Sequence, residues 1–467
     1  MPKPRLKRIF RNDLECVPDE LKQFLKLDTY SLLIKGTCGT GKTTLSLTIL
    51  KTLKATKNFF YISTRTSPQQ LFDYYPWLSK FVRPAEDFQY SNVDDQMSHP
   101  CFEDARLDEP ESLFERITNE LMDIKSPIIV IDSWDAIASL MDKESRINNE
   151  RVLQTWRERA KAKIIFITEG IQESPLDFMV DGVLELSNDI YNGTHLRKMS
   201  INKLRGIAIE NTSYLFSLQD NIVRFFCKYM PSQYTYHVPG AGDIVRTDIA
   251  REGNVSLQSG FRDFDLTVGG SLRKGDIVFI EMSKILCHSL PSLFLEKIIK
   301  EFIYKDGGIF IRASPVLLHL NNTIESIRHR DETKNFKSRY IGPQSANSVI
   351  EDSESTPAVT CLREFIESRP NKQILNIMGL TDLKKEMTEL NLSLYDLVYV
   401  FKKHFKLTFI ITDEEQDIRQ YLPITDLDLK FELIHGTLIL RCVLPSESIY
   451  GVNFREDGRG MQLHKIL

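Results

Sequence analysis

The sequence lacks the features that mark membrane, secreted and zinc-stabilised proteins. No apolar run approaches the roughly 18 residues that a membrane span needs, and no signal peptide opens the chain. The seven cysteines are scattered singly without a CxxC pair, which argues against structural zinc and for reduced thiols. We therefore expect a cytoplasmic protein without a membrane segment.

The chain also lacks a strong charge of either sign. Its formal net charge is −4 over 467 residues, which is too balanced to indicate nucleic-acid binding by itself. With 42% apolar and 27% charged residues, the composition is that of an ordinary globular protein. The length is sufficient for two or three domains, each with its own core.

Apolar runs alternate with helical patterns along the first half. Strands are predicted at 31–35, 58–63, 127–132 and 163–168, with helices at 43–54, 68–81, 110–124 and 143–162. This alternation predicts a mostly parallel β-sheet flanked by helices, an α/β domain. Two further strands, 180–187 and 196–206, flank the hairpin signal Asn192-Gly193, and 213–218 closes this antiparallel extension.

The most specific motif is GTCGTGKTT at residues 36–44. Its spacing, Gly36-x4-Gly41-Lys42-Thr43, is that of a P-loop between a strand and a helix. The glycines let the backbone turn its N–H groups toward the β- and γ-phosphates, in front of a positive helix N-terminus. Lys42 would add a charge between those phosphates, and the Thr43 hydroxyl would ligate Mg²⁺. The residues expected to hold ATP are Gly36, Thr37, Cys38, Gly39, Thr40, Gly41, Lys42, Thr43 and Thr44.

A carboxylate for the metal follows a second apolar run. PIIVID ends at Asp132, where a buried parallel strand would reach the sheet edge beside the P-loop. Asp132 is therefore expected to hold Mg²⁺ together with Thr43. The alternative is that Asp132 only caps the following helix, a role that suits Asp135 better.

The second half of the chain repeats this plan. An offset of 246 residues sets 275–299 on 29–53, and it also sets ILNIMG (374–379) on IIVIDS (128–133). Because one offset aligns several elements in order, we expect a tandem repeat of one domain. In the second copy the positions of Gly36, Gly39, Gly41, Lys42 and Asp132 are taken by Met282, Ile285, Cys287, His288 and Met378. Without the glycines, the lysine and the aspartate, this copy is predicted not to bind nucleotide.

Composition sets the expected boundaries. They are a basic arm (1–16), an ATP-binding domain (17–230), a polar linker (231–256) and a degenerate domain (257–467) with a mobile insert at about 328–357. The arm is expected to be a solvated tail, and contact with phosphate backbone or an acidic partner is the alternative.

These motifs resemble a known superfamily. SLLIKGTCGTGKTT, IIVIDSWDAI, VDGVLEL and KLRG resemble the RecA superfamily, specifically its KaiC-like group of tandem P-loop domains, and SGFRDFDLTVGGSLRKGDIVFIE (259–281) is similar to the start of a KaiC-type domain. YISTRTSPQQLFDYYPWL and the degenerate second copy look most like the gas-vesicle protein D family, archaeal regulatory P-loop proteins. The resemblance spans the chain from about residue 17 and implies two RecA-like domains.

The resemblance also exposes a departure at the catalytic position. In KaiC-like ATPases two glutamates follow the second strand, ahead of a Thr/Ser-Pro pair, and one of them activates the attacking water. Arg65 and Thr66 stand at those positions here, and an arginine cannot accept a proton from water. We expect slow or absent hydrolysis unless Asp135 or Glu169 substitutes, although both could equally be capping or ion-pair residues.

A basic pair points to assembly. Lys203 and Arg205 in NKLRG lie two apart on a predicted strand, so both side chains leave the same face. The resemblance implies that this pair crosses a subunit interface to the γ-phosphate of a neighbouring copy, which would make a homo-oligomer. The alternative is an exposed basic strand.

Three function classes follow. The first is a regulatory ATP-binding protein whose nucleotide state changes a surface for a protein partner, with transcription as the process that the resemblance suggests. The second is an ATPase of DNA recombination or repair, but GIQESPLDFMVDG is acidic where a basic DNA loop is wanted. The third is an autophosphorylating KaiC-like switch, which needs a second nucleotide site or an intact base. We favour the first, and leave open whether DNA is contacted and whether Cys38 senses oxidation.

Overall fold

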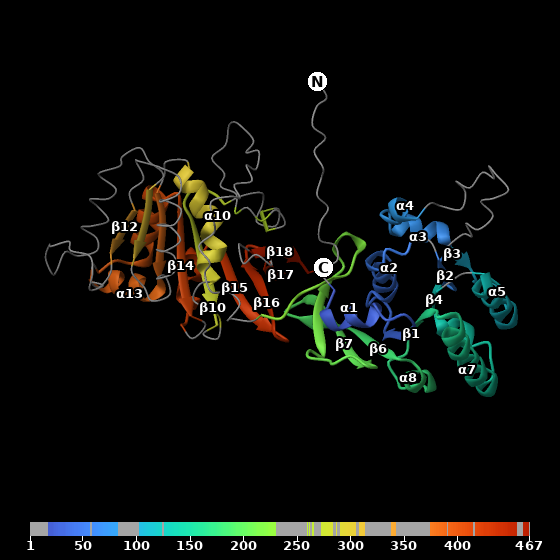
Figure 1. Ribbon diagram of the computed structural model, residues 1–467. Helices are drawn as coiled ribbons and strands as arrows, with labels where there is room; N and C mark the ends of the chain where they lie inside the picture. The colour runs from blue at the N-terminus through green and yellow to red at the C-terminus, as the bar shows by residue number, and fades with distance from the viewer. Residues whose placement is uncertain are drawn as a thin grey trace, which may run out of the picture. The chain divides into compact units, whose positions relative to one another are not determined.

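The computed structural model describes two compact units. It covers residues 17–82, 102–229, 272–312, 338–341, 374–454 and 461–466, with short gaps inside these ranges, and isolated residues between 259 and 265. The first unit ends at Cys227 and the second spans Lys228–Lys465 (Figure 1). The predicted basic arm (1–16) and linker (231–256) lie outside the described residues. No helix in the described ranges is long and apolar enough to cross a membrane.

The first unit is built on one mixed sheet. Its nine strands lie in the spatial order β3 (Phe102–Asp104), β2 (Phe59–Ser63), β4 (Ile128–Asp132), β5 (Lys163–Thr168), β1 (Tyr30–Gly36), β6 (Gly182–Tyr191), β7 (Thr194–Leu204), β8 (Ser213–Ser217) and β9 (Arg224–Phe225). All pairs from β3 to β6 are parallel, and the pairs from β6 to β9 are antiparallel. The predicted parallel sheet with an antiparallel extension is thus confirmed, although the short edge strand β3 was not predicted.

The hairpin between β6 and β7 follows from its two turn residues. Asn192 has φ 45° and Gly193 has φ 76°, the positive values that a two-residue hairpin turn requires at both positions. Asparagine and glycine reach these angles with little strain. The turn therefore sets the register in which Tyr191 pairs with Thr194.

Helices cover both faces of this sheet (Figure 1). One face packs against α1 (Asp19–Leu25), α2 (Lys42–Thr52), α3 (Pro68–Tyr74) and α4 (Leu78–Phe81), and the other against α5 (Pro110–Asp123), α6 (Trp134–Ala138), α7 (Lys143–Ala160) and α8 (Pro175–Met179). A short 3₁₀ helix, η3 (Gln219–Asn221), lies between β8 and β9. Each face has its own apolar cluster, so the central strands are buried on both sides, as parallel strands are.

One predicted helix is divided in the structure. The range 68–81 was predicted as a single helix, but α3 ends at Tyr74 and α4 begins at Leu78. Pro76 lies in the interruption, and the residue before it, Tyr75, has φ −123° and ψ 71°. A proline lacks the N–H of a continuing helix and disfavours helical angles in its predecessor, which explains the break.

The second unit repeats the strand order of the first. Its nine strands lie in the order β12 (Ser338–Ile341), β11 (Gly308–Arg312), β13 (Ile374–Gly379), β14 (Leu407–Asp413), β10 (Asp276–Met282), β15 (Leu427–Ile434), β16 (Thr437–Leu444), β17 (Ser448–Phe454) and β18 (Met461–Lys465). Parallel pairs again join β12 to β15, and antiparallel pairs join β15 to β18. β10 lies 246 residues after β1, which is the offset that the sequence indicated.

The helices of the second unit also separate into two packing clusters. α10 (Leu290–Tyr304) packs in one cluster, and α13 (Leu380–Glu389), α14 (Leu394–His404) and the 3₁₀ helix η6 (Arg419–Ile424) pack in the other. The predicted mobile insert at about 328–357 contains β12, so the interpretation as a loop is wrong for these four residues. They pair in parallel with β11 at the sheet edge, and the remainder of that range lies outside the described residues.

Candidate functional site

The loop between β1 and α2 requires glycine at two positions in particular. Gly36 has φ 155°, and a Cβ there would lie 2.5 Å from the backbone oxygen of Leu186. Gly41 has φ 96°, and its Cβ would lie 3.0 Å from the Leu218 side chain. Both positions combine left-handed angles with close packing, so the P-loop backbone is accessible to this sequence because glycine occupies them.

Lys42 is buried at the start of α2. Its ammonium group donates to the backbone oxygens of Gly36 (2.7 Å) and Thr37 (2.8 Å), which folds the side chain back over the loop. Burial lowers the pKa of Lys42, whereas the nearby carboxylates of Glu169 and Asp132 act in the opposite direction. The cation is therefore held among backbone carbonyls and two acids at the centre of the loop.

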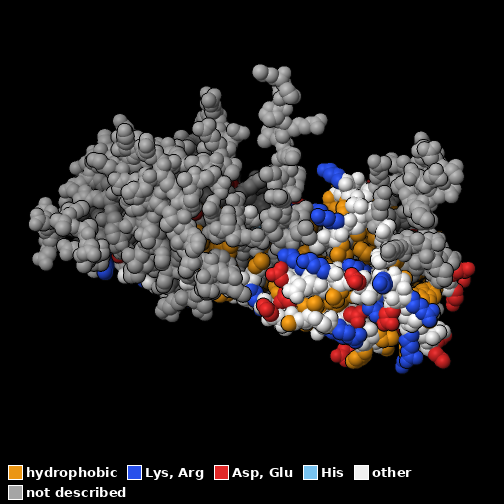
Figure 2. Space-filling model, viewed as in Figure 1, with side chains coloured by type: hydrophobic (Ala, Val, Ile, Leu, Met, Phe, Trp, Pro, Cys, Tyr) orange, Lys and Arg blue, Asp and Glu red, His pale blue; other side chains and the backbone are white. Residues whose placement is uncertain are grey.

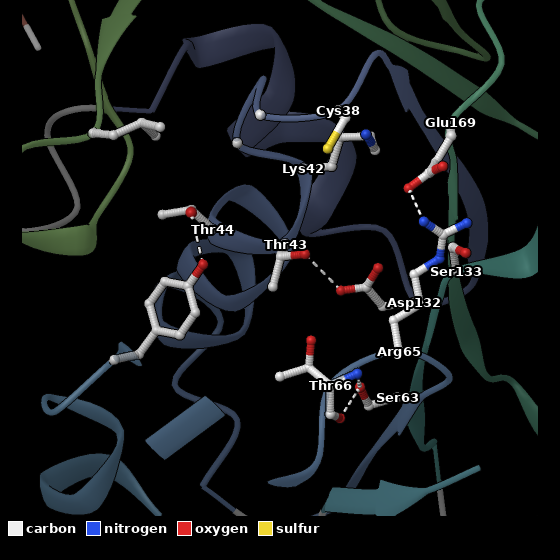
Figure 3. Close-up of a pocket in the computed structure, with 14 residues that line it drawn as sticks. Cys38, Lys42, Thr43, Thr44, Ser63, Arg65, Thr66, Asp132, Ser133 and Glu169 are labelled. Atoms are coloured by element: carbon white, nitrogen blue, oxygen red, sulfur yellow. Dashed lines mark hydrogen bonds and ion pairs between the residues drawn. The ribbon is translucent and has the colours of Figure 1, made fainter. Parts of the chain in front are cut away.

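Thr43 and Asp132 meet as the sequence indicated. The Thr43 hydroxyl donates to Oδ2 of Asp132 at 2.7 Å (Figure 3). The Tyr61 hydroxyl donates to the same oxygen at 2.6 Å. Burial raises the pKa of Tyr61, and the charge of Asp132 raises it further, so this phenol remains a donor. Tyr61 thus orients the carboxylate, which leaves Oδ1 outside these two hydrogen bonds.

Lys42, Thr43 and Asp132 line one cavity of about 300 Å³. Of the predicted site residues, the lining includes Cys38, Gly39, Gly41, Lys42, Thr43, Thr44, Arg65, Thr66, Asp132 and Glu169. Gly36, Thr37 and Thr40 belong to the same loop but do not line the cavity, and the Thr40 hydroxyl donates to Thr37 O at 2.9 Å. A cavity of this size is at the lower end of the range for small-molecule sites, about 300–1,000 Å³.

Arg65 and Glu169 form an ion pair at the wall of this cavity. Nη1 of Arg65 lies 2.5 Å from Oε1 of Glu169, and the two side chains are 52% and 35% exposed (Figure 3). Asp135 does not line the cavity, and its carboxylate instead accepts the backbone N–H of Glu169. Of the two proposed substitutes for the catalytic glutamate, one is therefore paired with Arg65 and the other supports that pair from outside.

Sequence reasoning missed four lining residues. Tyr75 contacts the Thr44 hydroxyl through its own hydroxyl at 3.0 Å, and Ser63, Ser133 and Leu218 complete the wall. Tyr61 was missed as well, although a signal existed. A tyrosine inside a buried strand needs a partner for its hydroxyl, and β2 lies next to β4, which ends in Asp132.

Lys203 and Arg205 lie at the other end of the sheet. Gly182 pairs with Leu204 and with Leu32 near the start of β1, whereas the P-loop follows the last residue of β1. Within the chain, Arg205 contacts Asp181 at 3.0 Å, and Lys203 donates to the Asp177 and Phe178 carbonyls. The pair is therefore separated from the cavity of its own chain, and a role toward a neighbouring copy stays a prediction.

The second unit carries methionine where the first has site residues. Met282 ends β10 as Gly36 ends β1, and Met378 lies near the end of β13 as Asp132 ends β4. Both methionines are buried. Ile285, Cys287 and His288 lie outside the described residues.

The residues of the first unit fit a magnesium nucleotide. Side chains at Gly36 and Gly41 would meet Leu186 and Leu218, so glycine at these positions preserves the loop whose N–H groups can bind phosphate. Lys42 supplies a cation at the same loop. The Thr43 hydroxyl and the Asp132 carboxylate are hard oxygen donors of the kind that Mg²⁺ prefers.

Comparison with known proteins supports nucleotide binding by the first unit. Residues 26–229 match the family described as "ATPase: KaiC". The chain is 26% identical over 365 residues to Protein GvpD1 of Halobacterium salinarum, covering 73% of this chain and 65%, just under two thirds, of GvpD1. It is 24% identical over 360 residues to Protein GvpD2 of the same organism, covering 73% of this chain and 71% of GvpD2. Residues 26–229 are therefore a KaiC-family RecA-like ATPase domain, which implies nucleotide binding, in a chain related to GvpD.

Proposed function

We propose that the first unit binds Mg·ATP, hydrolyses it slowly or not at all, and acts as a nucleotide-dependent switch on a protein partner. The observation that supports this proposal is the composition of the cavity wall. It has the lysine, the threonine and the aspartate that hold a nucleotide and its metal, but Arg65 in place of the usual glutamate. Such a site can keep ATP bound long enough to report its presence.

Each role falls to a residue of the cavity. The loop from Gly36 to Thr44 holds the phosphates, and Lys42 neutralises their charge. Thr43 and Asp132 hold Mg²⁺, with Tyr61 fixing the carboxylate. When bound, Mg²⁺ supplies charge neutralisation across the phosphates.

The second unit is proposed to be a degenerate RecA-like domain. Its sheet has the strand order of the first, and two of its strand ends carry buried methionines instead of Gly36 and Asp132. We place the two domains at about 17–230 and 257–467, with a linker between them. The existence of a protein partner, and transcription as the regulated process, are proposed from the resemblance to regulatory P-loop proteins.

Assembly is part of the proposal. Lys203 and Arg205 are expected to contact the nucleotide of a neighbouring copy, because their end of the sheet is opposite the P-loop of their own chain. Arg205→Ala should abolish an ATP-dependent increase in sedimentation coefficient without changing the affinity of the single chain for ADP. A wild-type chain that sediments identically with ATP and ADP would contradict this part.

An active ATPase of DNA recombination or repair has less support. Residues 170–181, which lie between β5 and β6, contain Glu173, Asp177 and Asp181 but no lysine or arginine. On the face drawn in Figure 2, basic and acidic side chains of the first unit are intermixed rather than gathered by sign. Neither feature resembles the continuous basic groove that follows a nucleic-acid backbone.

The test combines ATP binding with ATP turnover in the presence of Mg²⁺. Lys42→Ala should weaken ATP binding by at least about 100-fold, because it removes the cation between the phosphates. His288→Ala, at the aligned position of the second copy, is the matched control and should bind as the wild type does. Wild-type turnover should lie below about 1 per second, the lower limit for typical enzymes, and Arg65→Glu should raise it at saturating ATP.

Two results would overturn the proposal. One is ATP binding that survives Lys42→Ala unchanged, since the P-loop would then not be the site. The other is wild-type turnover well above about 1 per second, which would make the chain a working ATPase despite Arg65.

A further inference from the structure

The Arg65–Glu169 pair spans three neighbouring strand ends. Arg65 follows β2 and Glu169 follows β5, while β4, which ends in Asp132, lies between these strands. Figure 3 shows the pair beside Asp132 and Ser133. The pair therefore closes the cavity above the carboxylate that is proposed to hold the metal.

Hydrogen bonds hold the backbone at or next to both partners of the ion pair. The residue before Arg65, Thr64, donates its N–H to Asp132 O at 2.8 Å, and its hydroxyl accepts the Ser133 N–H at 2.8 Å. The Glu169 N–H is held by the Asp135 carboxylate. The two side-chain ends are half-exposed at the cavity, so the guanidinium can change partners without unfolding the strand ends.

A guanidinium at this place is chemically suited to a phosphate. Arginine is charged at every accessible pH and presents parallel N–H donors that match a carboxylate or a phosphate equally well. The carboxylate of Glu169 therefore occupies the donors that a terminal phosphate would use. Lys42 lines the same cavity as Arg65 and Glu169, so the pair faces the space beside the P-loop lysine.

We propose that Arg65 contacts the γ-phosphate and lets the site distinguish ATP from ADP, with Glu169 competing for the same guanidinium. This inference rests on the proposed nucleotide site and assigns its selectivity for ATP over ADP to Arg65. ATP displaces Glu169 from Arg65, whereas ADP leaves the Arg65–Glu169 pair intact.

The exchange of Glu169 for phosphate at Arg65 would be transmitted to the surface through the segment 65–75. Arg65 and Thr66 line the cavity, α3 follows from Pro68, and Tyr75 returns to the cavity, where its hydroxyl contacts Thr44. Both ends of the segment 65–75 thus touch the nucleotide site, while Tyr74 between them is exposed. A change at Arg65 therefore reaches the surface through α3.

The experiment measures equilibrium dissociation constants for Mg·ATP and Mg·ADP on the full chain. Arg65→Ala should weaken ATP binding about 10-fold and change ADP binding by less than about 2-fold, because it removes a charge-assisted contact to one phosphate. Glu169→Gln should strengthen ATP binding about 3-fold or more by weakening the competitor, again with little effect on ADP. Arg65→Lys, which keeps the charge but loses the parallel donors, should lie between wild type and Arg65→Ala.

Arg106→Ala is the matched control. Arg106 pairs with Asp104 at 2.6 Å, both side chains are about as exposed as Arg65 and Glu169, and neither residue lines the cavity. Its substitution should leave both affinities unchanged.

The outcomes separate this inference from the proposed function. Lys42-dependent binding in which Arg65→Ala weakens ATP and ADP equally, or neither, would overturn the role of Arg65 alone. Binding that does not depend on Lys42 would overturn the proposed function itself. Should Arg65→Ala fail to fold, the ratio of the two affinities in Arg65→Lys and Glu169→Gln decides the matter.

Hydrogen exchange provides a second readout. ATP should change amide exchange in residues 65–75 of the wild type, and Arg65→Ala should remove the difference between ATP and ADP there. An ATP-specific change that persists in Arg65→Ala would contradict the proposed transmission.

Discussion

The sheets of the two units have the same strand order but carry different residues at their strand ends. β1 ends in Gly36, whose missing side chain permits the P-loop, and β10 ends in the buried Met282. β4 ends in Asp132, and β13 carries the buried Met378 at the aligned position. The strand order is unchanged by these differences. The same strand order therefore forms with either set of strand-end residues, and we propose that these few residues decide whether a nucleotide site exists.

A second difference between the units lies at the residue before the last one of β1 and of β10. Lys35 in β1 pairs with Asp177 at 2.8 Å. The aligned residue of β10 is Glu281, and burial followed by the charge of Asp428 raises the pKa of Glu281 to about 7, against the opposing effect of Lys430 and Arg441. One unit thus has an ion pair where the other has two neighbouring carboxyl groups.

The largest expected effect comes from copying the second unit into the first. Gly36→Met should reduce ATP binding at least about 100-fold, because a Cβ would lie 2.5 Å from a backbone oxygen and the φ of 155° is unfavourable for methionine. Isothermal titration measures the loss. The reverse change, Met282→Gly, should destabilise the second unit by about 2–4 kcal/mol without creating a nucleotide site. Normal ATP affinity in Gly36→Met would contradict the importance of this position.

A smaller effect is expected at the metal carboxylate. Tyr61→Phe removes the 2.6 Å hydrogen bond to Asp132. This change should lower the affinity for Mg²⁺ in the presence of ATP about 10-fold, as the loss of a hydrogen-bond partner of a metal ligand does. Tyr30→Phe is the control, because its buried hydroxyl has no hydrogen-bond partner among the described residues. Mg²⁺ titrations in which both variants behave alike would disprove the orienting role of Tyr61.

The smallest expected effect is a difference between the two units in how their stability depends on pH. A carboxyl group whose folded pKa is raised from 4.5 to about 7 binds protons more tightly in the folded state, so it destabilises the fold once it is ionised. The free energy of unfolding of the second unit should therefore fall by about 1–2 kcal/mol as the pH rises from 5 to 8, after allowance for the partial exposure of Glu281. Glu281→Gln should remove most of this loss, as denaturant titrations at both pH values would measure.

The stability of the first unit should depend on pH in the opposite direction, because its carboxyl group has a lowered pKa. Burial acts to raise the pKa of Asp177, but hydrogen bonds from Lys35 and Ser174 lower it overall. This group contributes stability above its unfolded pKa of 3.8 that is lost as the pH falls below that value. Asp177 therefore leaves the stability of the first unit unchanged between pH 5 and 8, the window in which Glu281 lowers that of the second. A loss of stability in the first unit equal to that of the second over this window would refute the contrast between Lys35 and Glu281.

The sequence was sufficient for the central strands and for the P-loop. β1, β2, β4 and β5 are continuous apolar runs, and their ends lie within two residues of the predicted ones. The P-loop could be predicted because Gly36, Gly41 and Lys42 act through local backbone geometry, which depends on spacing alone. The pairing of Thr43 with Asp132 followed from the rule that parallel strands end at one edge.

Other features depend on contacts between distant segments. Arg65 and Glu169 are 104 residues apart in the chain, and each reads separately as an exposed charge. Their ion pair arises because β2 and β5 both border β4. The edge strands β3 and β12 contain three and four residues, too few for a period-2 pattern to distinguish them from loop.

The most direct test of the account is the number of nucleotides that one chain binds. Titration calorimetry of the full chain with Mg·ATP should give one site per chain, and Lys42→Ala should abolish the signal, because the second unit lacks the residues that hold a phosphate. Two sites per chain, or a site that remains in Lys42→Ala, would contradict the proposal that the two units have the same strand order but that only the first binds nucleotide.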